Sequence, residues 1–280
     1  AKCSGGHDNS PAVVGMYSIV KFYQLAGAGI RNYCTLAANF TCVERGVMAF
    51  VFPPHFYAAL PVAGSTDFFP VRRVYCVGRN YADHAREMGA LAQAEGREPP
   101  FFFMKPGDTV VGGTGELVVA YPPLTRNLHH EIELVVALGA GGANVAVDQA
   151  KSLVFGYAVG LDLTRRDIQA QAKEKGHPWD MGKGFDQSAV AGVIQPVAQV
   201  GHPANGRIWL RVNGETRQDG DLAAMSWKVA DIIANLSTLV RLEAGDLIYT
   251  GTPAGVGPLA PGDVLEAGVD GVGTLRARIV

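Results

Sequence analysis

Short segments in which apolar and polar residues alternate run through most of the chain. The clearest is residues 207–218, RIWLRVNGETRQ, where two alternating stretches flank Asn213-Gly214. Asn-Gly is the pair that type I′ turns favour, because both central residues of such a turn take positive φ. This segment therefore predicts a β-hairpin, and the C-terminal residues 262–280, GDVLEAGVDGVGTLRARIV, predict a second one.

Other apolar runs are bounded by glycine, proline or charged residues, and they predict further strands. They are residues 72–78 (RRVYCVG), 101–106 (FFFMKP), 116–123 (ELVVAYPP), 129–139 (HHEIELVVALG), 247–253 (LIYTGTP) and the second half of 147–164, which begins with a helical pattern.

Two segments have the spacing of amphipathic helices, residues 80–93 and 229–242. In the second, VADIIANLSTLVRL, the spacing puts five apolar side chains on one face: Ile232, Ile233, Leu236, Leu239 and Val240. Many strands and few helices, without a regular strand–helix alternation, predict an α+β or mainly β fold rather than a βαβ series.

The first 47 residues differ from this pattern. They have no sustained period of 2 or 3.6, they begin with Ala rather than Met, and they lack the arginine-rich, amphipathic character of a transit peptide. We expect residues 1–47 to be an N-terminal extension, either a cloning remnant or upstream sequence before a natural start at Met48, or else a short interaction arm. Residues 48–71 then form a lead-in, and residues 72–280 form a single domain.

Composition narrows the classes of partner. The 280 residues include 24 basic and 26 acidic ones, with no basic stripe for nucleic acid and no polybasic patch for a membrane surface. No apolar stretch reaches about 18 residues without Gly, Pro or charge, so we expect no transmembrane helix. The four cysteines form no spacing typical of zinc sites, and we expect a reduced, cytoplasmic protein with Cys76 buried in a strand.

Residues 128–138, LHHEIELVVAL, hold the first candidate chemistry. Residues i and i+2 of a strand point to the same side, so Glu131 and Glu133 project together and Ile132 faces the other way. Two such carboxylates could simply be solvated on an outward face. Asp162, however, ends a second apolar run, where an unpaired carboxylate would be costly. Three converging carboxylates favour an oxygen-only cation site for Mg²⁺ or Mn²⁺, with Ca²⁺ as a further candidate, over zinc.

Other residues could complete such a site. His129 shares the strand side of Glu131 and could bind the ion, although we expect it to orient the ligands instead. Residues 164–186 supply Arg166, Gln169 as an amide donor, and Lys183, which lies between two glycines that let the backbone approach a ligand closely. A solvated helix surface is the alternative for the basic residues of this segment, and we expect it for most of them: Arg165, Arg166, Lys173 and Lys175.

An acid–base pair is predicted within NYADHAREMG, residues 80–89. His84 and Glu87 are three residues apart and so lie on one side of a helix. A carboxylate beside an imidazole orients it and raises its basicity, which suits the removal of a proton from water, although the same spacing also occurs on solvated helices. Arg79, directly after a predicted strand, and Thr252, in a Gly/Pro turn, are candidate binding residues; an ordinary turn is the alternative for Thr252.

Six blocks of the chain, taken in order, resemble the fumarylacetoacetate hydrolase superfamily: YCVGRNYADHAREMG, FFFMKP, LHHEIELVVALG, GYAVGLDLTRRDIQ, PWDMGKGFD and GDLIYTGTPAGVGP. The resemblance covers residues 50–280 and implies a mixed β-sandwich roll of the C-terminal-domain type, usually a homodimer, with residues 72–280 as the catalytic domain. It implies Glu131, Glu133 and Asp162 as ligands of Mg²⁺ or Mn²⁺; His84, Glu87 and Lys183 as catalytic residues; and Arg79, Arg166, Gln169 and Thr252 as substrate-binding residues.

The resemblance also implies the reaction, which is the metal-dependent hydrolysis of a carbon–carbon bond in a 2,4-diketo acid. The most similar branch cleaves fumarylpyruvate to fumarate and pyruvate in gentisate degradation. Acylpyruvate hydrolysis and oxaloacetate decarboxylation on the same metal site are alternatives, and a non-catalytic protein with a structural ion is another. The distal carboxylate of fumarylpyruvate needs a cationic partner, for which Arg79, Lys105 and Arg126 are candidates.

Overall fold

The computed structural model describes residues 58–89 and 99–280. The chain divides into two units, Ala1–Pro54 and His55–Val280, and every described residue belongs to the second. The predicted extension over residues 1–47 lies outside the described residues. Among the helices that are described, none is long and apolar enough to cross a membrane.

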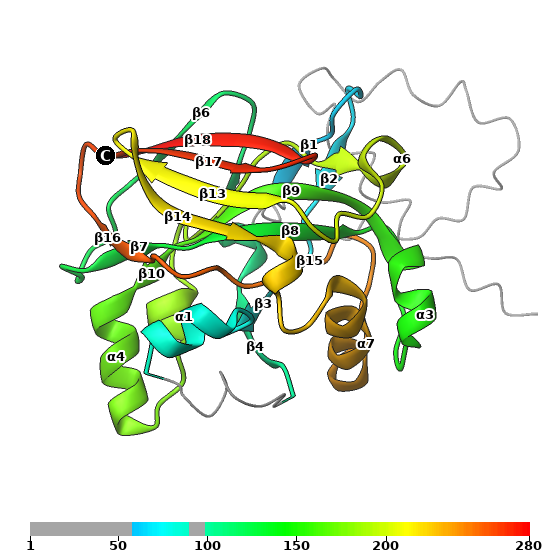
Figure 1. The fold of residues 1–280 in the computed structure, drawn as a ribbon, viewed down its shortest axis with the longest axis horizontal. Helices are drawn as coiled ribbons and strands as arrows, with labels where there is room; N and C mark the ends of the chain where they lie inside the picture. The colour runs from blue at the N-terminus through cyan, green and yellow to red at the C-terminus, as the bar shows by residue number, and fades with distance from the viewer. Residues whose placement is uncertain (1–57, 90–98) are drawn as a thin grey trace, which may run out of the picture. The chain divides into compact units, whose positions relative to one another are not determined.

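Two large mixed sheets form the described part of the chain (Figure 1). The first has the strand order β4-β3-β15-β8-β9-β11-β5, with β12 also paired to β9, and the second has the order β14-β13-β17-β18-β6. Parallel pairs (β3 with β15, β11 with β5, β18 with β6) occur beside antiparallel ones. This arrangement of curled, mixed sheets with a few helices confirms the predicted α+β fold.

The bounds of these strands are as follows. The first sheet contains β4 (Phe101–Lys105), β3 (Val74–Gly78), β15 (Leu247–Tyr249), β8 (Ile132–Leu138), β9 (Val154–Asp162), β11 (Ala189–Ala191), β5 (Val110–Gly112) and β12 (Gln195–Pro196). The second contains β14 (Glu215–Asp221), β13 (Arg207–Val212), β17 (Val264–Val269), β18 (Gly273–Ile279) and β6 (Glu116–Val119). Two smaller sheets join β1 (Ala59–Pro61) to β2 (Phe68–Pro70), and β10 (Thr164–Arg165) to β7 (Leu128–His130) and β16 (Gly257–Leu259).

Strand β8 is buried on both faces, which explains its almost uninterrupted run of apolar residues. Ile132 and Leu134 join the apolar cluster between the two large sheets, where β8 and β9 pack against β13, β17 and β18. Val135 and Ala137 join a second cluster on the opposite face, which also takes in the β1–β2 hairpin of the lead-in segment. The strand that carries Glu133 therefore lies between two apolar layers.

Both predicted hairpins are present. Asn213 has a φ of 52° and Gly214 a φ of 84°, which confirms the I′-type turn between β13 and β14. Strands β17 and β18 form the C-terminal hairpin.

The described helices are short, apart from two. They are α1 (Ala82–Glu87), α3 (Val147–Ala150), α4 (Arg166–Lys175), α5 (Asp180–Lys183), α6 (Val197–Val200) and α7 (Val229–Leu239), with 3₁₀ turns η3 (Gly107–Thr109), η4 (Lys151–Leu153) and η5 (Leu222–Ala224). In Figure 1, α1, α4 and α7 lie below β8 and β9, on the side away from the five-stranded sheet. The predicted helix over residues 80–93 is shorter within the described residues, and residues 90–93 lie outside them.

Two of the five residues predicted for the apolar face of α7 are not fully buried: Leu239 is exposed, and Val240, which caps the helix, is partly buried. Ile232, Ile233 and Leu236 are 2% exposed or less, but Leu239 is 68% exposed. The buried stripe is centred on Ile233 and Leu236, so Leu239 lies at its margin in the last helical turn.

Candidate metal centre and active site

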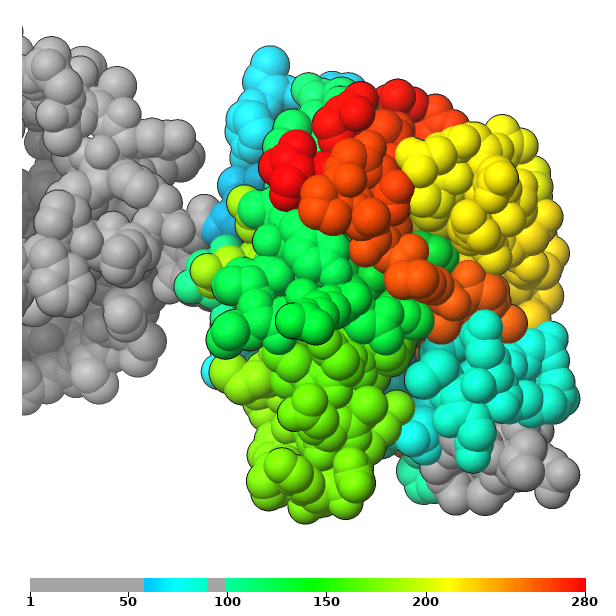
Figure 2. Space-filling view, turned by 90° about the vertical axis from the view of Figure 1, so that its left-hand side faces the viewer, coloured from blue at the N-terminus to red at the C-terminus, as the bar shows by residue number. Residues whose placement is uncertain are grey.

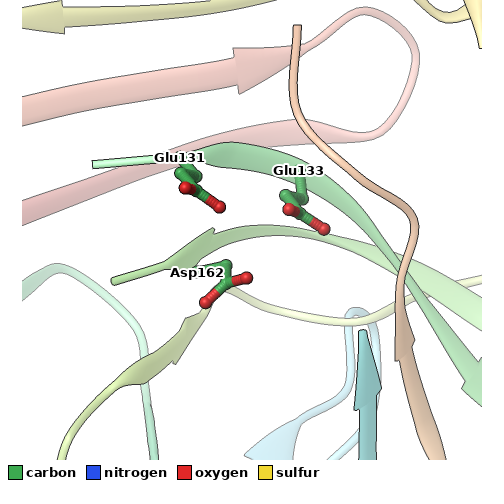
Figure 3. A group of neighbouring side chains, drawn as sticks. All are labelled: Glu131, Glu133 and Asp162. Carbon is green, nitrogen blue, oxygen red and sulfur yellow. The ribbon is translucent and has the colours of Figure 1, made fainter. Parts of the chain in front are cut away.

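The register between β8 and β9 brings three acidic side chains together (Figure 3). Glu133 pairs with Gly160, and the backbone N–H of Asp162 donates to the carbonyl oxygen of Glu131 at 2.9 Å. Because directly paired residues of an antiparallel ladder point to the same side, Asp162 projects toward Glu131 and Glu133. One carboxylate oxygen from each of the three lies within 4.8 Å of the others, so the acids converge as the sequence predicts.

Three cations surround this triad, two of them buried lysines. Lys105 Nζ lies 2.7 Å from Asp162 Oδ1, and Lys183 Nζ lies 2.8 Å from both Asp162 Oδ2 and Glu131 Oε2. The guanidinium of Arg166 pairs with Glu131 Oε1. Each lysine side chain is no more than 3% exposed. We call these six residues, the triad with Lys105, Lys183 and Arg166, the inner cluster.

The two glutamates differ in their affinity for a proton. Burial, with Asp162 and Glu131 beside it, raises the pKa of Glu133 well above its usual value. Burial also opposes ionisation of Glu131, yet Lys183 and Arg166 lower the pKa of that carboxyl well below its usual range. A bound divalent cation would favour the ionised form of all three acids.

The donor set fits a hard divalent ion. The three ligating groups are carboxylates, all of them buried, and their oxygens are close enough to meet at one centre. Oxygen-only sets of this kind suit Mg²⁺ or Mn²⁺ better than zinc.

His84 and Glu87 form the predicted pair on α1. His84 Nδ1 lies 3.2 Å from Glu87 Oε2, and the His84 side chain is 7% exposed. The backbone N–H of Gly255 donates to both oxygens of Glu87 at 3.2 Å, which fixes the carboxylate behind the imidazole. Burial lowers the pKa of His84, although Glu131 and Glu87 partly oppose this, so the imidazole is neutral near pH 7.

His129 holds Arg166 and does not join the triad. Its Nδ1 accepts from Arg166 Nε at 3.3 Å, and its Nε2 lies 2.9 Å from Asn127 Oδ1. Burial and then Arg166 lower the pKa of His129 to about 4, which keeps Nδ1 free of a proton. Arg166 also donates to Gln169 Oε1 at 2.7 Å. We expected His129 to orient the metal ligands. Its contact with Glu131 is indirect, because His129 holds Arg166 and Arg166 contacts Glu131.

Gln218, which is fully buried, fixes the turn that carries Thr252. Its Oε1 accepts from the backbone N–H of Ile132 at 3.1 Å and lies 3.0 Å from His130 Nδ1. Its Nε2 donates to Thr252 Oγ1 at 2.7 Å and to the carbonyl oxygen of Pro253 at 2.9 Å. One amide thus joins the start of β8 to the turn after β15. Gln218 was not predicted, since only the fold places β14 beside that turn.

Of the ten site residues that the family resemblance implies, all except Glu87 line one pocket, and Glu87 lies behind His84. Helices α1 and α4 both contribute to it, and Figure 2 shows them on one face of the molecule, α1 in cyan and α4 in lime green. The pocket also contains residues that the sequence did not single out for the site: Val77, Gly78, Met88, Phe103, Lys173 and Trp179. The spacing of Arg166, Gln169 and Lys173 is i, i+3, i+7, which places them on one face of α4 and could have indicated Lys173.

Three expectations need correction. Lys105 is fully buried, and its Nζ also donates to the carbonyl oxygen of Leu163, so it cannot hold a distal carboxylate. Arg126 is exposed and does not line the pocket. The glycine before Lys183 serves packing rather than ligand contact: a Cβ on Gly182 would lie 3.0 Å from the backbone nitrogen of Gln169, so glycine there allows α5 to pack closely on α4.

The chain is similar in sequence to known proteins. The family profile described as "Fumarylacetoacetate (FAA) hydrolase C-terminal" matches residues 73–280. A fumarylpyruvate hydrolase of Ralstonia sp is 47% identical over 184 residues, which is 65% of this chain and 93% of that protein. The mitochondrial oxaloacetate tautomerase FAHD1 of Mus musculus is 43% identical over 208 residues, 74% of this chain and 91% of that protein.

A solved structure is also similar to this chain. The crystal structure of fumarylpyruvate hydrolase from Pseudomonas aeruginosa in complex with Mn²⁺ and pyruvate superposes with a TM-score of 0.80 and 50% identity. The match covers 83% of this chain and 99% of that one.

Proposed function

The chain belongs to the fumarylacetoacetate hydrolase family, and from that premise we propose that it is a metal-dependent hydrolase that cleaves fumarylpyruvate to fumarate and pyruvate. One observation carries the proposal: a buried carboxylate triad and a buried histidine with a carboxylate partner face the same pocket. The relative named fumarylpyruvate hydrolase and the similar structure with Mn²⁺ and pyruvate support this choice of substrate.

Glu131, Glu133 and Asp162 would hold Mg²⁺ or Mn²⁺. When bound, such an ion supplies positive charge that attracts the carboxylate and 2-oxo end of the substrate and favours an enolate there. Arg166, Gln169 and Thr252 line the same pocket and offer hydrogen-bond donors to these oxygens.

His84 is the general base. Its Nδ1 faces Glu87, so the N–H of the neutral ring is held on that nitrogen and Nε2 is the basic one. Nε2 takes a proton from water, and the hydroxide oxygen attacks the C4 carbonyl of the diketo acid. A histidine with a lowered pKa is unprotonated near neutral pH and so is ready for this step.

The C3–C4 bond then breaks, and its electron pair leaves with the pyruvate fragment as an enolate. The ammonium of Lys183, beside Glu131 and Asp162, adds positive charge where this negative charge develops. His84 returns its proton to C3. Fumarylpyruvate and one water thus give fumarate and pyruvate, and ionisation of the new carboxylic acid releases one proton to solvent.

The test is the loss of the ultraviolet enol band of fumarylpyruvate with purified protein, with Mn²⁺, with Mg²⁺, and with excess chelator. We expect rapid loss with either metal, fumarate and pyruvate in equal amounts, and no turnover with chelator. No turnover with either metal would reject the proposed function.

Oxaloacetate tautomerisation is the second candidate, favoured by the 43% identical relative of that name. That reaction moves a proton between carbon and oxygen and needs no attacking water, so His84 would have no water to activate. Acetylpyruvate hydrolysis and oxaloacetate decarboxylation are further alternatives on the same metal site. Rates on fumarylpyruvate, acetylpyruvate and oxaloacetate, measured side by side, separate these activities.

A further inference from the structure

Lys173 occupies the third turn of the α4 face that carries Arg166 and Gln169, and it lines the pocket with them. Its side chain is half-buried, and its Nζ lies 5.0 Å from the centroid of the Trp179 ring. Among the described residues, no carboxylate lies within 4.0 Å of this ammonium group. Lys173 is therefore a pocket cation without an anionic partner in the described part of the chain.

A series of ring contacts leads from the inner cluster to Lys173. Lys183 Nζ lies 4.8 Å from the centroid of Phe103, and the Phe103 and Trp179 rings are 6.1 Å apart. Trp179 in turn contacts Phe101 edge-on, with ring centroids 5.5 Å apart. The wall between the inner cluster and Lys173 is thus aromatic, and such a wall suits a flat, conjugated chain.

Arg79 completes this end of the pocket. It takes a left-handed backbone conformation with a φ of 56°, and its guanidinium lies 5.5 Å from the centroid of Phe101. We call Lys173, Arg79, Trp179 and Phe101 the outer cluster. It brings together two cations and two aromatic rings.

The charges around Lys173 point to an anionic ligand. Burial first, and then the positive charges of Arg166 and Arg79, lower the pKa of Lys173 to about 8. The distant Glu131 opposes this only in part. A carboxylate of the ligand would relieve the repulsion between these cations.

We propose that the outer cluster binds the second carboxylate of a dicarboxylic 2,4-diketo acid, with Lys173 as the residue that sets this specificity and Arg79 beside it. This inference rests on the proposed hydrolase function and deepens it. The diketo head lies at the inner cluster, the planar unsaturated arm runs along Phe103 and Trp179, and the distal carboxylate meets Lys173.

The experiment compares two substrates that share the diketo-acid head. Fumarylpyruvate has the distal carboxylate and acetylpyruvate lacks it. The variants are Lys173→Met, which removes the charge and keeps an unbranched stem, and Lys173→Arg, which restores a cation. Lys175→Met is the matched control, because Lys175 is on the same helix but exposed and outside the pocket.

We expect Lys173→Met to lower kcat/KM for fumarylpyruvate roughly 10- to 100-fold, mainly through KM, because a hydrogen bond to a charged group is lost. The same variant should change kcat/KM for acetylpyruvate less than about threefold, because that substrate makes no such contact. Lys173→Arg should recover most of the fumarylpyruvate rate, and Lys175→Met should behave as the unaltered protein.

An equal loss on both substrates, or no loss on either, would overturn the inference while leaving the proposed function in place. If the unaltered protein does not hydrolyse fumarylpyruvate at all, the proposed function fails instead. Calorimetric binding of fumarate then decides on Lys173: weaker binding by Lys173→Met supports an anion site there, and equal binding rejects it.

Discussion

The inner and outer clusters of the pocket both contain cationic side chains, but they differ in whether carboxylates of the protein pair with them. In the inner cluster two of the three carboxylates, Glu131 and Asp162, form ion pairs with the three cations, and almost all of these groups are buried. In the outer cluster Lys173 faces other cations and aromatic rings, and it is only half-buried. The inner end is thus built around fixed charges of its own, whereas the outer end leaves positive charge for a ligand to meet. The inner cluster can therefore provide the chemistry that a family shares, and the outer cluster can determine which substrate binds.

Asp162→Asn should break the inner cluster and give the largest effect. The substitution leaves Lys105, which is fully buried, without its carboxylate, and it removes one candidate ligand of the ion. Breaking a buried pair from one side costs about 3–5 kcal/mol of stability. We expect a lower unfolding temperature, and Mn²⁺ affinity reduced by at least about 100-fold.

Thermal unfolding without metal and calorimetric titration with Mn²⁺ measure these two effects. Asp148→Asn, at an exposed position of α3, is the matched control. Lys173→Met should leave Mn²⁺ affinity unchanged, because it alters the outer cluster alone. Tight Mn²⁺ binding by Asp162→Asn would refute the assignment of the triad.

His84→Ala should separate the steps of the reaction without disturbing either cluster. We expect hydrolysis of fumarylpyruvate to fall about 10²- to 10⁴-fold, the usual contribution of a general base. Mn²⁺ affinity should stay the same, and any decarboxylation of oxaloacetate should persist, since that reaction needs no activated water. The control is His177→Ala, an exposed histidine after α4. Loss of hydrolysis and decarboxylation together would show that His84 does not act on water alone.

A pH series should distinguish the outer cluster from the inner one, and we expect it to give the smallest effect. The pKa of Lys173 is lowered to about 8, so the side chain is cationic below that pH and neutral above it. The ratio of kcat/KM for fumarylpyruvate to that for acetylpyruvate should therefore fall as pH rises from about 7 to about 9, by tenfold at most. Steps common to both substrates, including proton removal by His84, cancel in this ratio. A ratio that stays constant or rises would contradict the role of Lys173, and Lys173→Met should abolish the dependence.

The sequence was informative where one element decides the geometry. The two-residue period of a strand is enough to put Glu131 and Glu133 on one side, and the helical period puts His84 beside Glu87. The Asn213-Gly214 turn follows from local conformational preference, and its two positive φ values confirm it. These are short-range constraints, and the chain alone encodes them.

The sequence was less informative where packing between distant segments decides. The face of α4 that carries Lys173 is visible in the spacing, but whether it meets solvent or a pocket depends on where the helix docks. Lys105 was a candidate for the substrate's distal carboxylate and is instead fully buried, because its Nζ pairs with Asp162 and donates to the carbonyl oxygen of Leu163. The register of β8 with β9, which aligns Asp162 with Glu131, is likewise a tertiary property.

The amide of Gln218 influences the direction of the hydrogen bonds that Thr252 makes. Its orientation is unambiguous, since Oε1 accepts from the N–H of Ile132 and Nε2 donates to the carbonyl oxygen of Pro253. Thr252 Oγ1 therefore receives a hydrogen from Gln218, and its own hydrogen is left to point elsewhere. The hydroxyl hydrogen of Thr252 can thus be donated to a ligand oxygen while Oγ1 accepts from Gln218. A keto acid presents oxygens that can accept this hydrogen, so a glutamine remote in the sequence biases the hydrogen-bond polarity of the pocket toward such ligands.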